Sequence, residues 1–286
     1  MEALGMVDKS KIKIITFDFD GTTLQKDQTW FNHRTMKVMK ECQARGIHVI
    51  PCTGRSEDMF PPQLDKDQSF RYWITASGAR IVDRLTKEII YKETFTPEES
   101  AEICKLFEGR SLYCEIAAEG RLFFEKAILD ELWKYKVPFH HVWYFDTGKQ
   151  SVIYGKPSDF FIQQNIGIEK INLYGVPENH RKAINAGLRK LPYAAFPDND
   201  SEDIQVFCSH TDNVKAVETL FSHLGCTWEN VLSIGDSMLM DRTMIMHAGM
   251  GIAMENAPEA LKDVADIVAP PCYEDGFARV IEQYIL

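Results

Sequence analysis

The sequence lacks any long apolar run: no window approaches the roughly 18 consecutive apolar residues that a membrane-spanning helix needs. Its N-terminus also lacks the basic patch and apolar stretch of a secretory signal. Lys and Arg number 32 against 42 Asp and Glu, giving a net charge of −10 and no basic stripe. These absences argue against a membrane or nucleic-acid partner. They leave the oligomeric state open.

Cysteine is scarce and scattered. The seven cysteines run from Cys42 to Cys272 and include no pair separated by two residues. The odd number and irregular spacing indicate neither a disulfide framework nor a zinc motif. We therefore predict free, mostly buried thiols and a cytoplasmic location. Internal repeats and low-complexity tracts are absent as well.

The 286 residues are 45% hydrophobic, enough for one large domain or two modest ones. An apolar strand is predicted over residues 12–17, and a second over 47–53. Between them, Asn32 is a plausible helix N-cap and Gly46 lies just past the helix end. A strand, a helix and a strand in about 40 residues form a βαβ unit, which requires a parallel sheet.

The middle of the chain has a different pattern. Thr96 and Glu99 form a capping-box signature, two strands meet around Glu119, and a helix begins near Pro177. The strand–helix alternation returns at "DIQVFCS" and continues to the C-terminus. We predict an α/β fold with a doubly wound parallel-sheet core and an inserted α+β domain. The predicted core is residues 1–85 and 204–286, and the insertion is residues 86–203.

Aspartates gather where the predicted core strands end. Asp18 and Asp20 follow the first strand, and residues two apart on a strand point to one side. Asp236 follows a later strand, and Asp241 begins a short helix, where simple capping is an equally good explanation. Carboxylates on one side repel unless a cation lies between them or one is protonated. A set of hard oxygen ligands without His or Cys predicts Mg²⁺.

Donors that could hold a phosphate follow the same strands. Gly21, Thr22 and Thr23 offer backbone N–H groups in a turn, Thr53 offers a hydroxyl, and Gly54 an unobstructed amide. Such amides bind anions. A carboxylate nucleophile, a metal and this cradle together predict phosphoryl transfer through an aspartyl-phosphate, on a small phosphorylated substrate.

Four motifs occur together in a fixed order. They are "DFDGTTL" (18–24), "PCTGR" (51–55), "TASGARI" (75–81) and "SIGDSMLMDRTMIMHAGMGIAMENAPEALKDVAD" (233–266). The sequence resembles the haloacid dehalogenase (HAD) superfamily, and within it the Cof-type sugar-phosphate phosphatases. The resemblance implies a Rossmann-like core, with the middle section as a cap of the C2 type.

The resemblance also implies residue roles. Asp18 would be the nucleophile and a metal ligand. Asp20 would first be the general acid and then the base that activates water, and its backbone carbonyl would contact the metal. The remaining implied roles are phosphoryl binding by Thr53 and Gly54, direct metal ligation by Asp236, and ligation or ordering of metal-bound water by Asp241.

Three departures accompany the resemblance. Asn213 occupies the place of the family's motif-three lysine, because Val217 and Leu220 extend the apolar stripe on its side of the helix while Lys215 falls on the opposite face. Asn213 is therefore the candidate for phosphate binding at that position, and Lys215 or another lysine stays the alternative source of the positive charge. The spacing to Asp241 is one residue longer than usual, and Ser77 replaces a common asparagine.

Two other functions stay open. One, motivated by Asn213, is a phosphosugar-binding or regulatory protein on a weakened phosphatase scaffold, and the other is a mutase, which would reuse the phosphoryl group instead of releasing it. The intact Asp18 and Asp20 pair favours catalysis, since a binding protein needs no carboxylate poised for proton transfer. The adjacent His140 and His141 are predicted to face opposite ways on a strand, which argues against a metal site there. Aromatic residues beside them, such as Trp143 and Tyr144, are expected to pack within the cap.

Overall fold

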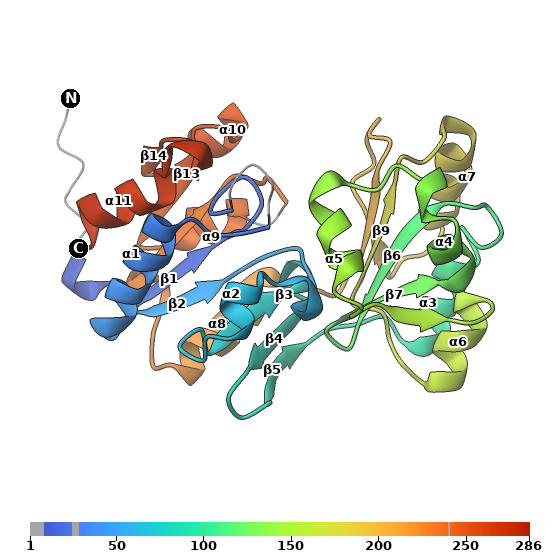
Figure 1. Cartoon of the computed structure of the whole chain (residues 1–286), viewed down its shortest axis with the longest axis horizontal. Coiled ribbons are helices and arrows are strands. Elements are labelled where there is room, and N and C mark those ends of the chain that lie inside the picture. Colours follow the sequence, from blue (N-terminus) through green and yellow to red (C-terminus); the bar gives the residue numbers. More distant parts are fainter. Residues whose placement is uncertain (1–8, 25–28, 240) are drawn as a thin grey trace. The chain divides into compact units, whose positions relative to one another are not determined.

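The computed structural model describes residues 9–24, 29–239 and 241–286. It divides the chain into two units (Figure 1). The core unit consists of Met1–Gly54, Phe60–Tyr91 and Asn213–Leu286, and the cap unit of Arg55–Met59 and Lys92–Asp212.

A parallel sheet forms the centre of the core unit. Its strands are β1 (Ile14–Phe17), β2 (His48–Pro51), β12 (Val231–Gly235), β13 (Met250–Met254) and β14 (Ile267–Ala269), in the order β14-β13-β12-β1-β2. Every neighbouring pair is parallel, and Ile14 of β1 lies opposite Val231 on one side and His48 on the other. The first strand is thus flanked by strands from both ends of the chain. The predicted α/β fold with a parallel core sheet is confirmed.

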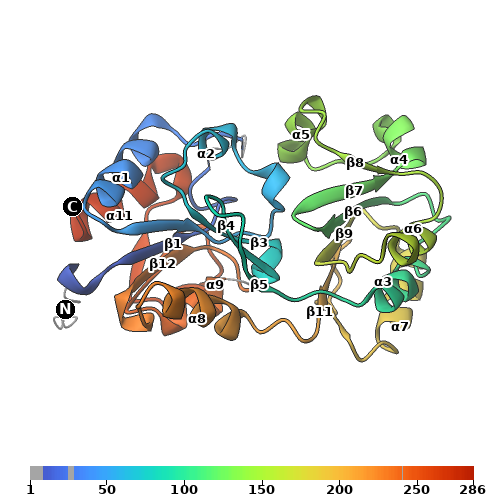
Figure 2. The same cartoon turned by 90° about the horizontal axis from the view of Figure 1, so that it is seen from below.

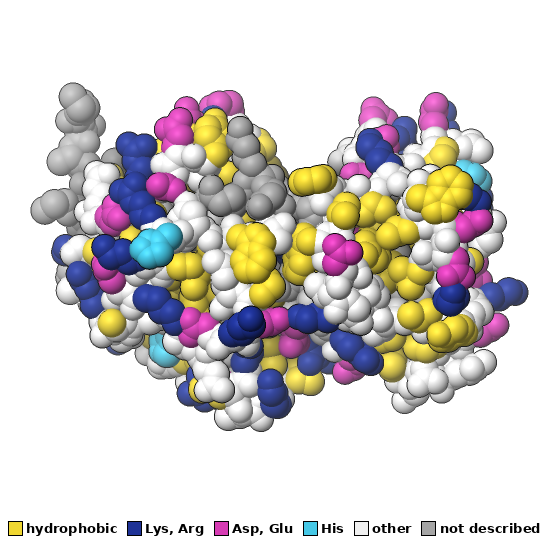
Figure 3. Space-filling model, in the orientation of Figure 1, with side chains coloured by type: hydrophobic (Ala, Val, Ile, Leu, Met, Phe, Trp, Pro, Cys, Tyr) yellow, Lys and Arg dark blue, Asp and Glu magenta, His cyan; other side chains and the backbone are white. Residues whose placement is uncertain are grey.

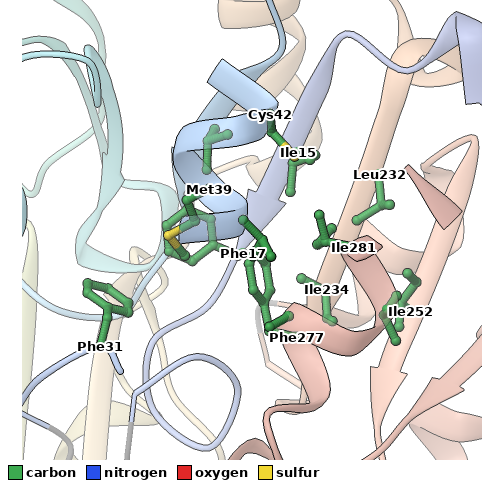
Figure 4. Close-up of a cluster of buried hydrophobic side chains, with 14 of the residues drawn as sticks. Ile15, Phe17, Phe31, Met39, Cys42, Leu232, Ile234, Ile252, Phe277 and Ile281 are labelled. Carbon is green, nitrogen blue, oxygen red and sulfur yellow. The ribbon is translucent and has the colours of Figure 1, made fainter. Parts of the chain in front are cut away.

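Helices cover both faces of this sheet (Figure 2). The helices of the core unit are α1 (His33–Ala44), α2 (Pro62–Asp65), α8 (Asn213–His223), α9 (Asp241–His247), α10 (Glu259–Lys262) and α11 (Gly276–Tyr284). The predicted cap of α1 is present, because the Asn32 side chain accepts a hydrogen bond from the Thr35 N–H at 2.7 Å. In Figure 4, Phe17 of β1 packs toward α1 and α11, and its ring centroid lies 5.7 Å from that of Phe277.

A three-stranded sheet extends the core unit. It contains β3 (Tyr72–Thr75), β4 (Arg80–Asp83) and β5 (Ile89–Lys92). The 3₁₀ turn between β3 and β4, η3 (Ala76–Gly78), has positive φ at all three residues, 48°, 58° and 87°. Such backbone is unfavourable for Ala76 and Ser77, so the surrounding packing must hold it in place.

The cap unit is built on a second, mainly antiparallel sheet. Its strands are β6 (Tyr113–Ala118), β7 (Arg121–Glu125), β8 (Ser151–Ile153), β9 (Lys170–Tyr174), β10 (Ala194–Ala195) and β11 (Ile204–Cys208), in the order β10-β11-β9-β6-β7-β8. Its helices are α3 (Pro97–Cys104), α4 (Lys126–Asp130), α5 (Val142–Asp146), α6 (Pro157–Gln164) and α7 (Glu178–Leu188). The predicted capping box of Thr96 and Glu99 begins α3.

Both faces of the cap sheet are covered. Side chains of β6 alternate between two apolar clusters: Cys114 and Ile116 join the one that includes residues of α3, α6 and α7, whereas Tyr113 and Ala117 join the one that includes residues of α4 and α5. This explains why every residue of β6 is buried. The predicted packing role of Tyr144 holds, since it is fully buried in the second cluster.

The structure places the boundaries of the units later than the sequence did, after residues 91 and 212 instead of 85 and 203. The first moves because β4 and β5 belong to one sheet. The second moves because β11 pairs antiparallel with β9, with Ile204 opposite Leu173. His140 and His141 lie in the 3₁₀ turn η5 (Phe139–His141), so the predicted strand is wrong there.

The surface and the thiols agree with the composition. On the face drawn in Figure 3, acidic and basic side chains of the described residues are interspersed. None of the helices in the described ranges is long and apolar enough to cross a membrane. The seven cysteines are free, and all except Cys272 are buried.

Candidate active site

Asp18 lies at the carboxyl end of β1, where the chain leaves the sheet. Its backbone N–H donates to the Ile234 carbonyl at 3.2 Å, which continues the β1–β12 pairing. Its own carbonyl accepts from Thr23 Oγ1 at 2.5 Å. The turn that follows is closed by the Leu24 N–H, which donates to the Phe19 carbonyl at 3.0 Å. These bonds fix the backbone that carries the Asp18 carboxylate.

Two further carboxylates come from the other end of the chain. Asp236 directly follows β12, and Asp241 is the first residue of α9. Asp241 Oδ2 accepts from the N–H of Asp236 at 2.9 Å and from that of Ser237 at 2.7 Å. The approach is so close that a Cβ on Gly235 would lie 2.2 Å from the Asp241 Cγ. The sequence requirement for glycine at 235 is therefore steric.

The three carboxylates converge. One oxygen each from Asp18, Asp236 and Asp241 lies within 4.8 Å of the others. Asp18 is 9% exposed and Asp241 is 3% exposed, while Asp20 is half-buried. Asp20 is not part of this group of three carboxylates. The meeting of acidic residues from both ends of the chain at one sheet edge is what the parallel topology dictates.

Burial and mutual repulsion perturb these acids. Burial, and after it the charges of Asp241, Asp20 and Asp236, raise the pKa of Asp18 well above its ordinary value. Burial likewise raises the pKa of Asp236 to about 6 and that of Asp241 to about 7. The metal-free site thus resists holding all its charges at neutral pH. A bound cation would relieve this cost.

Asp236 is oriented by two side chains. Thr22 Oγ1 donates to Oδ1 at 2.9 Å, and Asn256 Nδ2 donates to Oδ2 at 3.0 Å. Asn256 Nδ2 also lies 3.0 Å from the Gly21 carbonyl oxygen, so Asn256 links the "DFDGTTL" turn to Asp236. The sequence reasoning did not single out Asn256. Its position in "ENAPEALK", directly after β13, was the available signal.

The turn after Asp18 uses some of the predicted phosphate donors for its own structure. The N–H groups of Thr22 and Thr23 donate to the Phe19 carbonyl at 3.3 and 3.1 Å, so they close the turn. The Thr22 hydroxyl donates to Asp236 and positions that carboxylate, and the assignment of Thr22 to phosphate binding stays a prediction. Gly21 has φ +78°, and a Cβ there would lie 2.2 Å from Asp236 Oδ2.

Thr53 and Gly54 follow the second strand, although β2 ends at Pro51, two residues before the predicted end. Thr53 is 1% exposed, and its backbone is anchored on both sides. Its N–H donates to the Ile74 carbonyl at 3.0 Å, and its carbonyl accepts from the Ser77 N–H at 3.1 Å. The strained turn η3 is thereby tied to the residue that is expected to hold phosphate.

Asn213 begins α8 and packs on η3. A Cβ on Gly78 would lie 2.4 Å from Asn213 Oδ1, which is buried and has no hydrogen-bond partner among the described residues. Lys215 is exposed, whereas Val217 and Leu220 are buried, so the two faces of α8 are as predicted. The alignment of Asn213 with the lysine position therefore agrees with the burial of the helix.

Comparison with known proteins identifies the family. A family model described as haloacid dehalogenase-like hydrolase matches residues 15–281. The chain belongs to this family. It is 24% identical over 278 residues to the 5-amino-6-(5-phospho-D-ribitylamino)uracil phosphatase YcsE of Bacillus subtilis, covering 96% of both chains. The phosphatase YwpJ of the same organism is 22% identical over 293 residues, with 96% of this chain and 100% of that one covered.

Solved structures share the fold. A haloacid dehalogenase-like hydrolase from Bacteroides thetaiotaomicron superposes with a TM-score of 0.77 at 21% identity, covering 95% of this chain and 99% of that one. A structure described as a HAD subclass IIB sugar phosphatase gives a TM-score of 0.74 at 21% identity, covering 96% and 100%. The predicted Cof-type relationship and the two-part fold are confirmed, and the protein is a phosphatase of this family.

Proposed function

We propose that the protein is a Mg²⁺-dependent phosphatase of small phosphorylated metabolites, with Asp18 as its nucleophile. The observation that carries the proposal is the convergence of Asp18, Asp236 and Asp241 at one edge of the core sheet. Their oxygen-only ligand set suits Mg²⁺. Their raised pKa values supply the reason for an ion, since a protonated Asp18 cannot attack phosphorus.

Different residues would hold the ion and orient the phosphoryl group. Asp18, Asp236 and Asp241 would hold the ion, with the Asp20 carbonyl as a further ligand, and Thr22 and Asn256 keep Asp236 in place. When bound, Mg²⁺ supplies positive charge that offsets the carboxylates and the substrate phosphate. Thr53 and Gly54 would orient the phosphoryl oxygens.

The reaction then proceeds in two displacements. An oxygen of Asp18 forms a bond to phosphorus while the ester P–O bond breaks, and Asp20 donates its proton to the departing alcohol. Asp20 then accepts a proton from water, whose oxygen attacks phosphorus and releases Asp18 together with orthophosphate. Each half-reaction uses the same two carboxylates, which restores the enzyme.

A phosphorylated sugar or sugar alcohol is the substrate class that we propose. The relative YcsE is named for a substrate with a phosphorylated ribityl group, and a structural neighbour is described as a sugar phosphatase. The identities of 24% and 21% support the class and leave the particular metabolite open.

The proposal is tested by following orthophosphate release from a panel of phosphorylated metabolites, with Mg²⁺ and with a chelator. We expect turnover of sugar phosphates that stops on chelation and is absent in Asp18→Asn. A protein that never releases phosphate from any ester, or that keeps its full rate without metal, would refute the proposal.

Asp20→Asn provides a matched comparison within the same site. Its loss of kcat/KM should be larger for a sugar phosphate than for p-nitrophenyl phosphate, because nitrophenolate departs without protonation and kcat/KM does not include the later hydrolysis of the common aspartyl-phosphate. Equal losses of kcat/KM on both substrates would show that Asp20 is not the acid.

A further inference from the structure

A second group of metal-ligating side chains lies in the cap unit. It consists of Glu93, Cys208 and His210, and one ligand atom of each lies within 4.8 Å of the others. Glu93 is near Lys92, where the chain enters the cap unit, and the other two are near Asp212, where it leaves. Two segments far apart in the sequence therefore meet at one cluster.

We propose that Glu93, Cys208 and His210 form a binding site for a divalent transition metal of the zinc class. Thiolate and imidazole are ligands that Zn²⁺ and its neighbours prefer, whereas Mg²⁺ prefers oxygen. The cluster is therefore chemically distinct from the aspartates of the candidate active site. Its sulfur and nitrogen ligands lie two residues apart, at the last residue of β11 and in the turn that follows it.

The geometry is near that of a bound ion. Zinc bonds of 2.0–2.3 Å place tetrahedral ligand atoms about 3.3–3.8 Å apart, so ligand atoms within 4.8 Å of one another need to approach by at most about 1–1.5 Å. Cys208 is 3% exposed, Glu93 is half-buried and His210 is exposed. A buried sulfur with an exposed imidazole leaves a path for the ion from solvent. Three protein ligands leave the fourth position for water.

The backbone fixes the position of the buried ligand. Cys208 ends β11 opposite Ala194 of β10. The next residue, Ser209, donates its N–H to the Tyr193 carbonyl at 2.8 Å, and the Thr211 N–H donates to the Cys208 carbonyl at 3.0 Å. The sulfur is therefore held by the sheet, and the exposed His210 is the ligand with freedom to adjust.

Binding would join the two ends of the Lys92–Asp212 segment of the cap unit. An ion that binds the folded chain and not the unfolded one stabilises it by mass action, by about 2.7 kcal/mol at one hundred times its Kd. The cap unit should accordingly resist denaturation more strongly when this site is filled.

The test uses the full chain, stripped of metal and then supplied with excess Mg²⁺, which favours the aspartates. Co²⁺ is titrated as the probe, because a cobalt–thiolate bond has a charge-transfer absorption that oxygen ligands do not produce. We expect one such site per chain. Cys208→Ser should abolish the absorption, and Glu93→Gln and His210→Asn should each weaken Co²⁺ affinity by about tenfold or more.

Cys272→Ser is the matched control, since Cys272 is more exposed than Cys208 and lies outside the cluster. It should leave the absorption unchanged, and so should Asp236→Asn, which separates this site from the proposed phosphatase chemistry. The proposal is overturned by the absence of thiolate absorption at saturating Co²⁺, by its survival in Cys208→Ser, or by wild-type affinity in Glu93→Gln and His210→Asn. If Cys208→Ser does not fold, the Co²⁺ affinity of Glu93→Gln still decides the test, because Glu93 is only half-buried.

Discussion

Asp241 should destabilise the metal-free protein, so replacing it should increase stability while impairing the response to metal. Its side chain is 3% exposed, and burial raises its pKa from 3.8 to about 7. At about 1.36 kcal/mol per pKa unit, this difference of 3.2 units corresponds to about 4 kcal/mol. We expect Asp241→Asn to be more stable than the wild type by about that amount at pH 8 without metal.

The pH dependence follows from the sign of the shift. The carboxyl of Asp241 binds its proton more tightly in the folded protein than in the unfolded one. The stability that this proton contributes is fully present below pH 3.8 and is lost as the pH rises to about 7. At pH 5 the wild type has lost only the stability that disappears between pH 3.8 and pH 5. The advantage of Asp241→Asn should therefore shrink to about 2 kcal/mol at pH 5.

Urea unfolding in the presence of a chelator, at both pH values, measures these differences. Repeating it with Mg²⁺ at one hundred times its Kd should stabilise the wild type by about 2.7 kcal/mol and the variant much less. Asp263→Asn, an exposed position in the core unit, is the control and should behave as the wild type in both buffers. Lower stability of Asp241→Asn than of the wild type at pH 8 without metal, or an equal advantage at pH 5, would contradict this prediction.

Three further predictions address other parts of the chain. Gly46→Ala should cost about 1–2 kcal/mol in urea unfolding because of its positive φ, and Gly21→Ala should cost at least as much, because its Cβ would also lie 2.2 Å from Asp236 Oδ2. Only Gly21→Ala should also weaken Mg²⁺-dependent phosphate release, since nothing lies within 4 Å of a Cβ at Gly46; equal activity in both variants would contradict this. Asn213→Lys should raise kcat/KM if Asn213 occupies the lysine position, and an unchanged value would discredit that alignment. His141→Ala should destabilise the cap unit by about 3–5 kcal/mol, measured by urea unfolding, because it removes the partner 2.7 Å from the buried Glu115; a loss below about 1 kcal/mol would refute that.

The sequence predicted the acidic cluster because parallel strands end at a common sheet edge. Asp18 and Asp236 could therefore be expected to meet from their positions after apolar strands alone. The role of Thr22 could not be predicted in the same way. A threonine in a turn offers an amide and a hydroxyl, and only the fold shows that the amide closes the turn and the hydroxyl binds Asp236.

The limits of the cap were harder to predict for a related reason. Residues 204–208 alternate as a strand should, and the sequence revealed the strand itself. Alternation does not reveal which sheet a strand joins, however, because a partner is selected by contacts distant in sequence. Here β11 pairs with β9, so the chain returns to the core only at Asn213.

The arrangement of Asn213 connects the electrostatics of the site to its chemistry. If Asn213 takes the lysine position, as we predict, it brings no positive charge to the three acidic side chains, whereas the family's lysine would. Its Oδ1, buried and without a partner against Gly78, adds an unsatisfied polar atom instead. Under the proposed function, the electrostatic cost of the carboxylates would therefore fall more heavily on a bound ion here than it would beside a lysine. Stability and turnover should consequently depend on the same ion, and both should decline together as it is withdrawn.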